Sequence, residues 1–217
     1  DVPTFLSSVD KTIDIAKRIE ASTGQKLSFI DFGGGPGIPY TESQKLFPVD
    51  EYAKGISLKI KSSGMDAEVA IEPGRFIVGD AGILLVEANT VEEKNIPVVG
   101  VNAGFNTLVR PAMYGSYQEI VVCDNVDSTC KKEYMVAGNL CETGDVFTEN
   151  RKVLRSLPHV CEGGVLAILD AGAYGFSMAS TYNSRPLSAE VMIDGAESKI
   201  IRRRQTLDDI LREQENL

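Results

Sequence analysis

The sequence has 217 residues with a formal net charge of −9, and 43% of its residues are hydrophobic while 24% are charged. This composition is typical of a globular protein that buries a sizeable core, and no apolar run reaches the roughly 18 residues of a membrane span. The acidic balance disfavours nucleic acid and anionic membranes as partners, because both bind basic surfaces.

The first part of the chain alternates predicted helices and strands. Apolar residues recur near a 3.6-residue period from about Ser8 to Ser22, and Gly24 is placed to end that helix. The apolar runs Leu27–Phe32 and Glu68–Glu72 predict strands, and a second helix is predicted between them at Asp50–Ser62. This alternation over residues 1–79 is typical of an α/β barrel or a layered α/β unit.

The pattern changes after about Gly79, where short apolar runs are separated by Gly, Asn and Asp. These runs are ILLVEANTV, VVGVNAG, EIVVCDNVD, EYMVAG, VLAILDAG and AEVMIDG. They predict a β-rich domain over residues 80–217. The last segment, Arg203–Glu215, returns to helical spacing and is expected to dock on a domain surface. The basic run Arg202–Arg204 is interpreted as a solvated helix face.

The cysteine pattern disfavours a metal site. The cysteines are Cys123, Cys130, Cys141 and Cys161; they show no CxxC spacing, and the single His159 offers no obvious metal partner. Because the N-terminus also lacks the features of a signal peptide, we expect reduced thiols and a cytoplasmic location. Cys123 and Cys130 are interpreted as ordinary strand residues rather than as a pair facing each other across a hairpin.

Two loops that each follow a predicted strand carry candidate chemistry. GGGPG at Gly33–Gly37 offers bare backbone N–H groups that suit a phosphate, although a structural tight turn explains it as well. It is neither a Walker A loop nor a dinucleotide fingerprint. EPGR supplies a carboxylate at Glu72 and a guanidinium at Arg75, and the alternative is a surface ion pair around a Pro-Gly turn. Their positions at neighbouring strand ends favour an active face.

A guanidinium and a phenol stand close together in the β-rich part. Arg110 precedes Tyr114 in RPAMY, so the two side chains can grip one carboxylate, and an Arg-Pro turn with a packed tyrosine is an equal alternative. Tyr174 lies in a GAY turn after a strand, where its hydroxyl can reach a phosphate or its ring can be half-buried core.

The CETGD segment places a thiol beside a carboxylate. Cys141 is a candidate proton donor and Glu142 a candidate counter-charge for an amine, whereas a buried structural role is commoner for cysteine. Further along the chain, Tyr-Asn-x-Arg-Pro at Tyr182–Pro186 adds more polar chemistry than packing requires.

Taken in order, GGG, EPGR, RPxxY, CExGD and GAY resemble the fold-type III pyridoxal-phosphate-dependent amino-acid decarboxylases, across nearly all 217 residues. Ornithine and arginine decarboxylases share several of these segments, but RPAMYGSYQEI and CETGD are more similar to the diaminopimelate decarboxylases. The resemblance implies an alanine-racemase-like (β/α)8 TIM-type barrel, of which residues 1–79 are the last part. It also implies a β-rich sandwich or Greek-key barrel domain with a terminal helix over residues 80–217.

The resemblance implies pyridoxal 5′-phosphate as the cofactor. The backbone amides of Gly34 and Gly35 would bind its phosphate, and Tyr174 would touch both phosphate and substrate. The cofactor would also contact Glu72, Pro73, Gly74 and Arg75. Glu72 would keep the pyridine nitrogen protonated, so that the ring remains an electron sink.

The resemblance also implies the reaction, which is decarboxylation of meso-diaminopimelate to L-lysine in lysine biosynthesis. Arg75, Arg110 and Tyr114 would hold the substrate carboxylate, and Tyr174 would also contact the substrate. Glu142 would recognise the distal amino end, and Cys141 would return a proton after CO2 has left. In this family the cysteine and glutamate come from the neighbouring subunit, which implies a homodimer with shared active sites.

Part of the family's pattern has no counterpart in this sequence. The Schiff-base lysine, the ring-stacking histidine and the first barrel strands are missing, because Lys11, Lys17 and Lys26 stand in other contexts and His159 follows the cysteine motif. We therefore expect an inactive fragment that needs an upstream segment of the same polypeptide. An ornithine- or arginine-type decarboxylase and a non-catalytic binding homologue stay open as alternatives.

Overall fold

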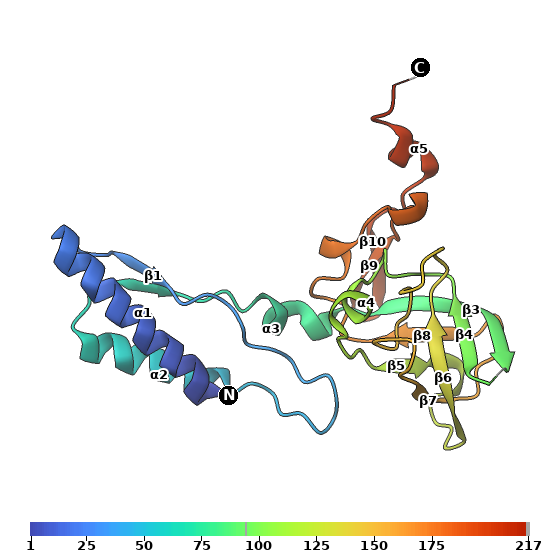
Figure 1. Ribbon diagram of the computed structural model, residues 1–217, viewed down its shortest axis with the longest axis horizontal. Helices are drawn as coiled ribbons and strands as arrows, with labels where there is room; N and C mark the ends of the chain where they lie inside the picture. The colour runs from blue at the N-terminus through green and yellow to red at the C-terminus, as the bar shows by residue number, and fades with distance from the viewer. Residues whose placement is uncertain (94, 216–217) are drawn as a thin grey trace. The chain divides into compact units, whose positions relative to one another are not determined.

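The computed structural model describes residues 1–93 and 95–215 and divides the chain into two compact units, Asp1–Gly79 and Asp80–Leu217 (Figure 1). Within the described residues, no helix combines the length and the apolar character that crossing a membrane requires.

The first unit opens with helix α1 (Val2–Thr23), which begins before the expected start at Ser8. The Asp1 carboxylate caps it by accepting a hydrogen bond from the Thr4 N–H at 3.0 Å, and a proline stands in the first turn. An aspartate cap with a proline in the first turn is a signal for the start of a helix, so the expected start at about Ser8 was wrong. Gly24 ends the helix in the left-handed conformation (φ 70°), which confirms its expected role.

Two short parallel strands and a second helix complete the core of the first unit. They are β1 (Phe29–Asp31), α2 (Val49–Ser63) and β2 (Glu68–Ala70). Helices α1 and α2 lie side by side (Figure 1). Phe5 of α1, Tyr52 of α2 and Phe47, which precedes α2, form an edge-to-face aromatic cluster. Strands β1 and β2 are the only parallel sheet of this unit's described residues, so they do not form a complete barrel.

The second unit is built on one six-stranded sheet in the order β5-β8-β3-β4-β6-β7. The strands are β3 (Leu84–Glu93), β4 (Pro97–Val101), β5 (Ile120–Val122), β6 (Lys131–Ala137), β7 (Arg155–Pro158) and β8 (Val165–Ile168). All neighbours are antiparallel except β4 and β6. The edge strands β5 and β7 also contact each other, so the sheet nearly closes into a barrel.

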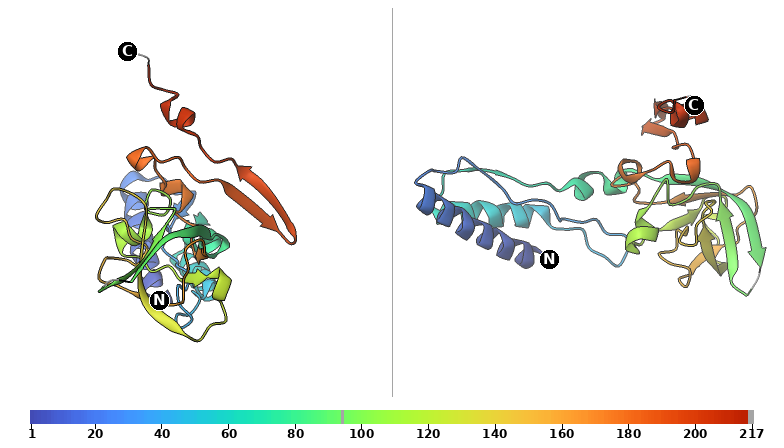
Figure 2. Two further views of the ribbon diagram at one scale, coloured as in Figure 1. Left: turned by 90° about the vertical axis from the view of Figure 1, so that its right-hand side faces the viewer. Right: turned by 45° about the horizontal axis from the view of Figure 1, so that its top comes forward.

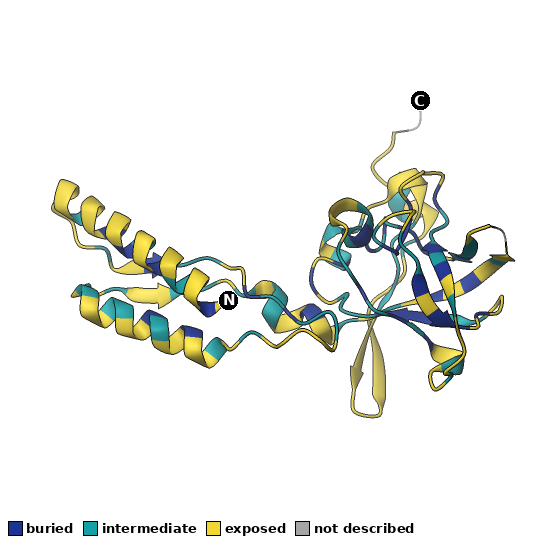
Figure 3. Cartoon of the chain, turned by 60° about the horizontal axis from the view of Figure 1, so that its bottom comes forward, coloured by how far each residue is buried: buried dark blue, intermediate teal, exposed yellow. Residues whose placement is uncertain are grey.

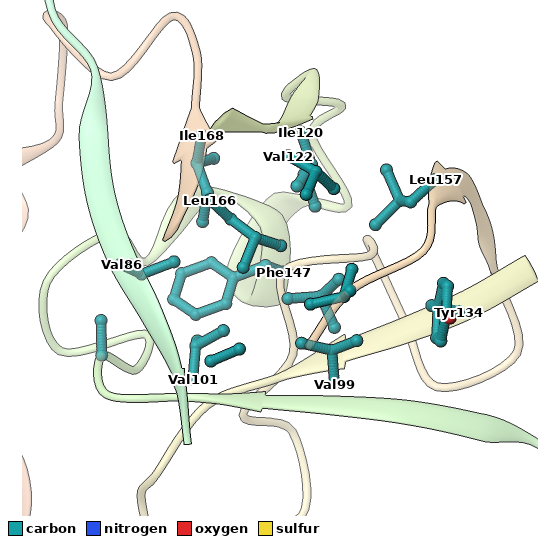
Figure 4. Packing of buried hydrophobic residues seen from close by; sticks show 14 of the residues in the cluster. Val86, Val99, Val101, Ile120, Val122, Tyr134, Phe147, Leu157, Leu166 and Ile168 are labelled. Atoms are coloured by element: carbon teal, nitrogen blue, oxygen red, sulfur yellow. The ribbon is translucent and has the colours of Figure 1, made fainter. Parts of the chain in front are cut away.

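The barrel interior is apolar, as the alternation of the strands predicts. On β3, Val86 and Ala88 point inward and are buried, whereas Leu85 before them and Glu87 between them are exposed. Phe147 is fully buried and lies among Val86 and the side chains of neighbouring strands (Figure 4). Expectations of strands in the six apolar runs are confirmed, whereas β7 was not foreseen.

Outside the barrel lies a separate two-stranded hairpin, β9 (Glu190–Asp194) and β10 (Glu197–Arg202). Figure 2 shows the two strands of this hairpin side by side. Its residues are almost entirely exposed (Figure 3). Among the described residues that follow the hairpin, the only regular helix is α5 (Leu207–Leu211). The expected helix over Arg203–Glu215 was therefore too long. Arg202 ends a strand, and the basic run is therefore not a helix face.

The C-terminal helix also differs from expectation in its packing. Leu207 and Leu211 are exposed, so α5 does not dock by an apolar face within its unit. Thr206 starts the helix through a reciprocal capping box with Asp209, and Arg203 pairs with the same carboxylate.

The cysteines are free and exposed. Cys123 lies in a 3₁₀ turn (Cys123–Asn125), and Cys130 directly precedes β6. The interpretation of both as strand residues was therefore wrong, because a short turn and an extended lead-in carry the same local composition as a strand end.

Candidate active site

The glycine loop and the EPGR turn lie against each other in the first unit. They follow β1 and β2, which are paired in parallel with Phe29 opposite Glu68. The pairing continues past the strands, because the Glu72 N–H donates to the Gly33 carbonyl at 2.8 Å. The expectation that both loops stand at neighbouring strand ends is confirmed.

The loop needs glycine because its backbone runs very close to other atoms. A Cβ at Gly34 would lie 2.6 Å from the Glu72 carbonyl oxygen, and one at Gly35 would lie 2.7 Å from the Phe5 ring. Gly35 also has φ 118°, which side chains rarely tolerate. Among the described residues, no group accepts a hydrogen bond from the N–H of Gly34 or Gly35. These two open donors fit a phosphate.

The EPGR segment forms a turn that leads directly into a short helix. Glu72 is exposed, and Gly74 begins α3 (Gly74–Val78) with Pro73 at its cap position. Arg75 is half-buried beside Gly37, and its Nη1 lies 3.4 Å from the Tyr40 hydroxyl. A Glu72–Arg75 ion pair, the alternative interpretation, is not found among the described residues.

In the second unit, one arginine is held between two tyrosine rings. Arg110 begins the short helix α4 (Arg110–Tyr114), and its guanidinium lies 5.6 Å from the Tyr114 ring centre and 5.3 Å from that of Tyr174. Neither a carboxylate nor a carbonyl of the described residues accepts a hydrogen bond from this guanidinium. A guanidinium fixed by stacking and left without an acceptor fits an incoming carboxylate.

The position of Tyr174 depends on an uncommon backbone geometry. Its φ is 59°, in the left-handed region that a bulky residue seldom adopts. The turn is tied to the start of β3, where the Ala171 N–H donates to the Gly82 carbonyl at 2.8 Å. A Cβ at Gly82 would lie 2.6 Å from Gly172. Backbone strain that tight packing maintains is typical of functional sites.

The CETGD turn is organised around a buried carboxylate. Asp145 accepts hydrogen bonds from the N–H groups of Phe105 at 2.6 Å and Leu140 at 2.8 Å. Burial raises its pKa, and these two donors act in the opposite direction. Gly138 leaves room for the carboxylate, since a Cβ there would collide with it. Asp145 thereby joins the turn to the loop that precedes Arg110.

Cys141 and Glu142 are presented to solvent by this turn. They line an open hollow of about 460 Å³ whose wall also includes Arg151. Glu142 accepts a hydrogen bond from the Tyr182 hydroxyl, and Cys141 donates its N–H to Asn183. The sequence did not identify Asp145, Tyr182 or Asn183 as partners of this turn. The carboxylate directly after Gly144 in CETGD was the available signal for Asp145.

The structure therefore forms three groups from the predicted site residues. Gly34, Gly35 and the EPGR turn make one group in the first unit. In the second unit, Arg110, Tyr114 and Tyr174 make another, and Cys141 and Glu142 make a third. No cluster of three or more His, Cys, Asp or Glu side chains in residues 1–93 and 95–215 is arranged to hold a metal ion.

Comparison with known proteins identifies the family. Residues 11–172 match the family described as "Pyridoxal-dependent decarboxylase, C-terminal sheet domain". The diaminopimelate decarboxylase of Methanothermobacter thermautotrophicus is 46% identical over 219 residues, covering 99% of this chain and 50% of the relative. The chain spans about half the length of the relatives that it matches.

Solved structures agree with this match. The M. jannaschii diaminopimelate decarboxylase in complex with L-lysine has a TM-score of 0.89 at 33% identity, covering 100% of this chain and 49% of that one. A lysine/ornithine decarboxylase from Vibrio vulnificus shares the fold at a TM-score of 0.69 and 18% identity, covering 85% of this chain and 48% of that one. This chain belongs to the pyridoxal-dependent decarboxylase family.

Proposed function

We propose that the protein catalyses the pyridoxal-phosphate-dependent decarboxylation of meso-diaminopimelate to L-lysine and CO2, a step of lysine biosynthesis. The observation that carries this proposal is the acceptor-free Arg110 guanidinium between Tyr114 and Tyr174. It supplies a carboxylate receptor, which a substrate with a distal carboxylate needs. Relatives named diaminopimelate decarboxylase at 46% and 40% identity over 99% of the chain support the same substrate.

The cofactor site in this proposal is the glycine loop with the EPGR turn. The open N–H groups of Gly34 and Gly35 bind the phosphate, and Glu72 keeps the pyridine nitrogen protonated. Pro73, Gly74 and Arg75 complete the contacts with the cofactor, and Tyr174 adds its hydroxyl to the phosphate. When bound, pyridoxal phosphate supplies a ring that accepts the electron pair left by CO2.

The substrate site uses residues of both groups in the second unit. Arg110, Tyr114 and Arg75 hold the distal carboxylate. This grip orients the other carboxylate for departure. Glu142 is the counter-charge for the distal amine. Cys141 is exposed, so its thiol is available to return a proton to the carbon from which CO2 has left.

We further propose that the unit Asp1–Gly79 is the last part of a (β/α)8 barrel that the rest of the polypeptide completes. The parallel pair β1 and β2, with a helix between, supports this assignment. The cofactor lysine would come from the remaining polypeptide.

We also propose a homodimer in which Cys141 and Glu142 serve the neighbouring subunit's site. We propose in addition a cytoplasmic location, with which free, exposed cysteines are compatible.

The test is CO2 release by the full-length protein loaded with pyridoxal phosphate, with meso-diaminopimelate, ornithine, arginine and lysine as substrates. Release confined to meso-diaminopimelate is the expected result. Release from ornithine or arginine would keep the chemistry and overturn the carboxylate-binding roles of Arg110 and Tyr114. Cofactor binding without release from any of the four would favour a non-catalytic binding homologue.

A further inference from the structure

The segment Thr181–Arg185, which we term the positioning segment, makes direct hydrogen bonds to the turn that carries Cys141 and Glu142. The Asn183 Oδ1 accepts the Cys141 N–H at 3.0 Å, and the Tyr182 hydroxyl donates to the Glu142 Oε2 at 3.2 Å. Each candidate residue of the turn therefore has its own partner. These contacts join residues that lie 42 and 40 positions apart in the sequence.

Two further contacts attach the positioning segment to the barrel on either side of the turn. The Arg185 Nη2 donates to the Asn139 carbonyl at 3.2 Å, just before the turn begins. The Tyr182 ring packs against Phe105, with ring centres 5.1 Å apart. Since the Phe105 N–H donates to the buried Asp145 carboxylate, the turn is held from its interior and from its exposed side.

The backbone of the positioning segment is strained at the point of contact. Asn183 and the following Ser184 both have positive φ, at 54° and 55°. One left-handed residue is common at a turn, whereas two in succession without glycine are costly and persist only when the surroundings impose them. The geometry aims the Asn183 amide at the Cys141 backbone.

We propose that Tyr182 and Asn183 are positioning residues, Asn183 for the Cys141 thiol and Tyr182 for the Glu142 carboxylate. This inference rests on the proposed function, because it assigns a reason to hold these two side chains. Fixing the Cys141 N–H fixes the direction of its Cα–Cβ bond, and this limits the thiol to the few positions that rotation about that bond allows. The Tyr182 hydroxyl donates to Oε2 of Glu142, and the Gly144 N–H donates to Oε1 at 3.2 Å, so both carboxylate oxygens are held in place. The lone pairs that remain on them can accept from an amine.

Amide hydrogen exchange in the full-length protein tests the contact without any assay of activity. Asn183→Gly removes the acceptor while glycine tolerates the backbone, so the Cys141 N–H should exchange about fivefold faster. Asn183→Asp keeps an acceptor and the left-handed tendency, and should restore slow exchange. Ser184→Gly is the matched control and should leave the Cys141 rate unchanged. Equal Cys141 rates in wild type and Asn183→Gly would overturn the proposal.

Steady-state kinetics on meso-diaminopimelate then separate positioning from general loss of structure. Asn183→Gly should lower kcat more than it raises KM, because the thiol acts after substrate has bound. Tyr182→Phe keeps the ring contact with Phe105 and should raise KM with a smaller change in kcat. If kcat and KM changed in the same way in both variants, the separate roles of Tyr182 and Asn183 would be overturned. An inactive wild type would instead overturn the proposed function, while the exchange rates would still decide the contact.

Discussion

The Arg155 guanidinium lies 2.8 Å from the Glu149 carboxylate, and both side chains are largely removed from solvent, at 9% and 16% exposure. The Tyr117 ring covers the same guanidinium with 3.7 Å between the Arg155 Cζ and the ring centre. A charged pair thus stands in the wall of the barrel, where β7 closes the sheet. Removing one partner of a buried pair leaves an uncompensated charge.

Replacing Arg155 alone should therefore destabilise the protein far more than replacing both partners. We expect Arg155→Met to lower the free energy of unfolding by about 3–5 kcal/mol, and the double variant with Glu149→Met to recover most of that loss. Urea unfolding of the full-length protein measures both values. Additive losses in the double variant would show that the two side chains do not stabilise each other.

Stability should also depend on pH through Tyr117. Burial, and then its hydrogen bond to Glu119, raise the pKa of Tyr117 to about 12, although the Arg155 charge acts in the opposite direction and Glu149 adds to the rise. Below about pH 10 the phenol is protonated in both the folded and the unfolded state. Between about pH 10 and 12 only the unfolded state loses the proton, so stability falls as pH rises.

Tyr117→Phe removes the titrating phenol. Comparison with the wild type therefore separates the effect of Tyr117 on stability from that of other groups that titrate at alkaline pH. The difference in slope between wild type and variant should stay below about 1.4 kcal/mol per pH unit, the limit for one proton. Unfolding free energies at several pH values from 9 to 12 provide the comparison. Identical slopes would mean that the phenol titrates equally in both states.

Substrate affinity should depend on the planar fork of Arg110 and not only on its charge. Arg110→Gln removes the charge, and we expect it to raise KM for meso-diaminopimelate roughly 10- to 100-fold, as loss of a charge-assisted hydrogen bond does. Arg110→Lys keeps the charge but loses the planar fork and the stacking on Tyr114 and Tyr174. Its KM should therefore lie between the KM of the wild type and that of Arg110→Gln. A KM that neither substitution moves would exclude Arg110 from the carboxylate site.

Because the glycine loop lies so close to the EPGR turn, we expect that adding one methyl group at Gly34 will lower the stability of the protein. Gly34→Ala places a Cβ 2.6 Å from the Glu72 carbonyl oxygen and should cost about 1–3 kcal/mol of stability by overpacking. Gly74→Ala is the matched control for stability, since no atom lies within 4 Å of its Cβ. Urea unfolding should show a lower midpoint for Gly34→Ala only.

Local patterns were sufficient for much of the fold. The alternation around Val86 and Ala88 located β3, and Gly24 marked the end of α1, because burial and left-handed backbone act on neighbouring residues. The loops of the candidate site could also be predicted from the sequence, since GGGPG and EPGR each follow an apolar strand.

Features that depend on contacts between residues far apart in the sequence could not be predicted. The sequence RSLP carries an arginine and a proline, yet it forms β7 because β6 pairs with it and Glu149 neutralises Arg155. The contact between Asn183 and Cys141 joins segments that no periodicity connects. The terminal helix starts late because Thr206 caps it, and a periodic pattern alone extends too far.

The hairpin β9–β10 and the loop that follows it have a practical consequence for handling the protein. A two-stranded ribbon with no third strand opens easily in water, and Arg203 and Arg204 stand in an exposed extended loop beyond it. Trypsin should therefore cut first around Lys199 and Arg202–Arg204. The early cleavage product would keep the six-stranded, nearly closed barrel and lose α5.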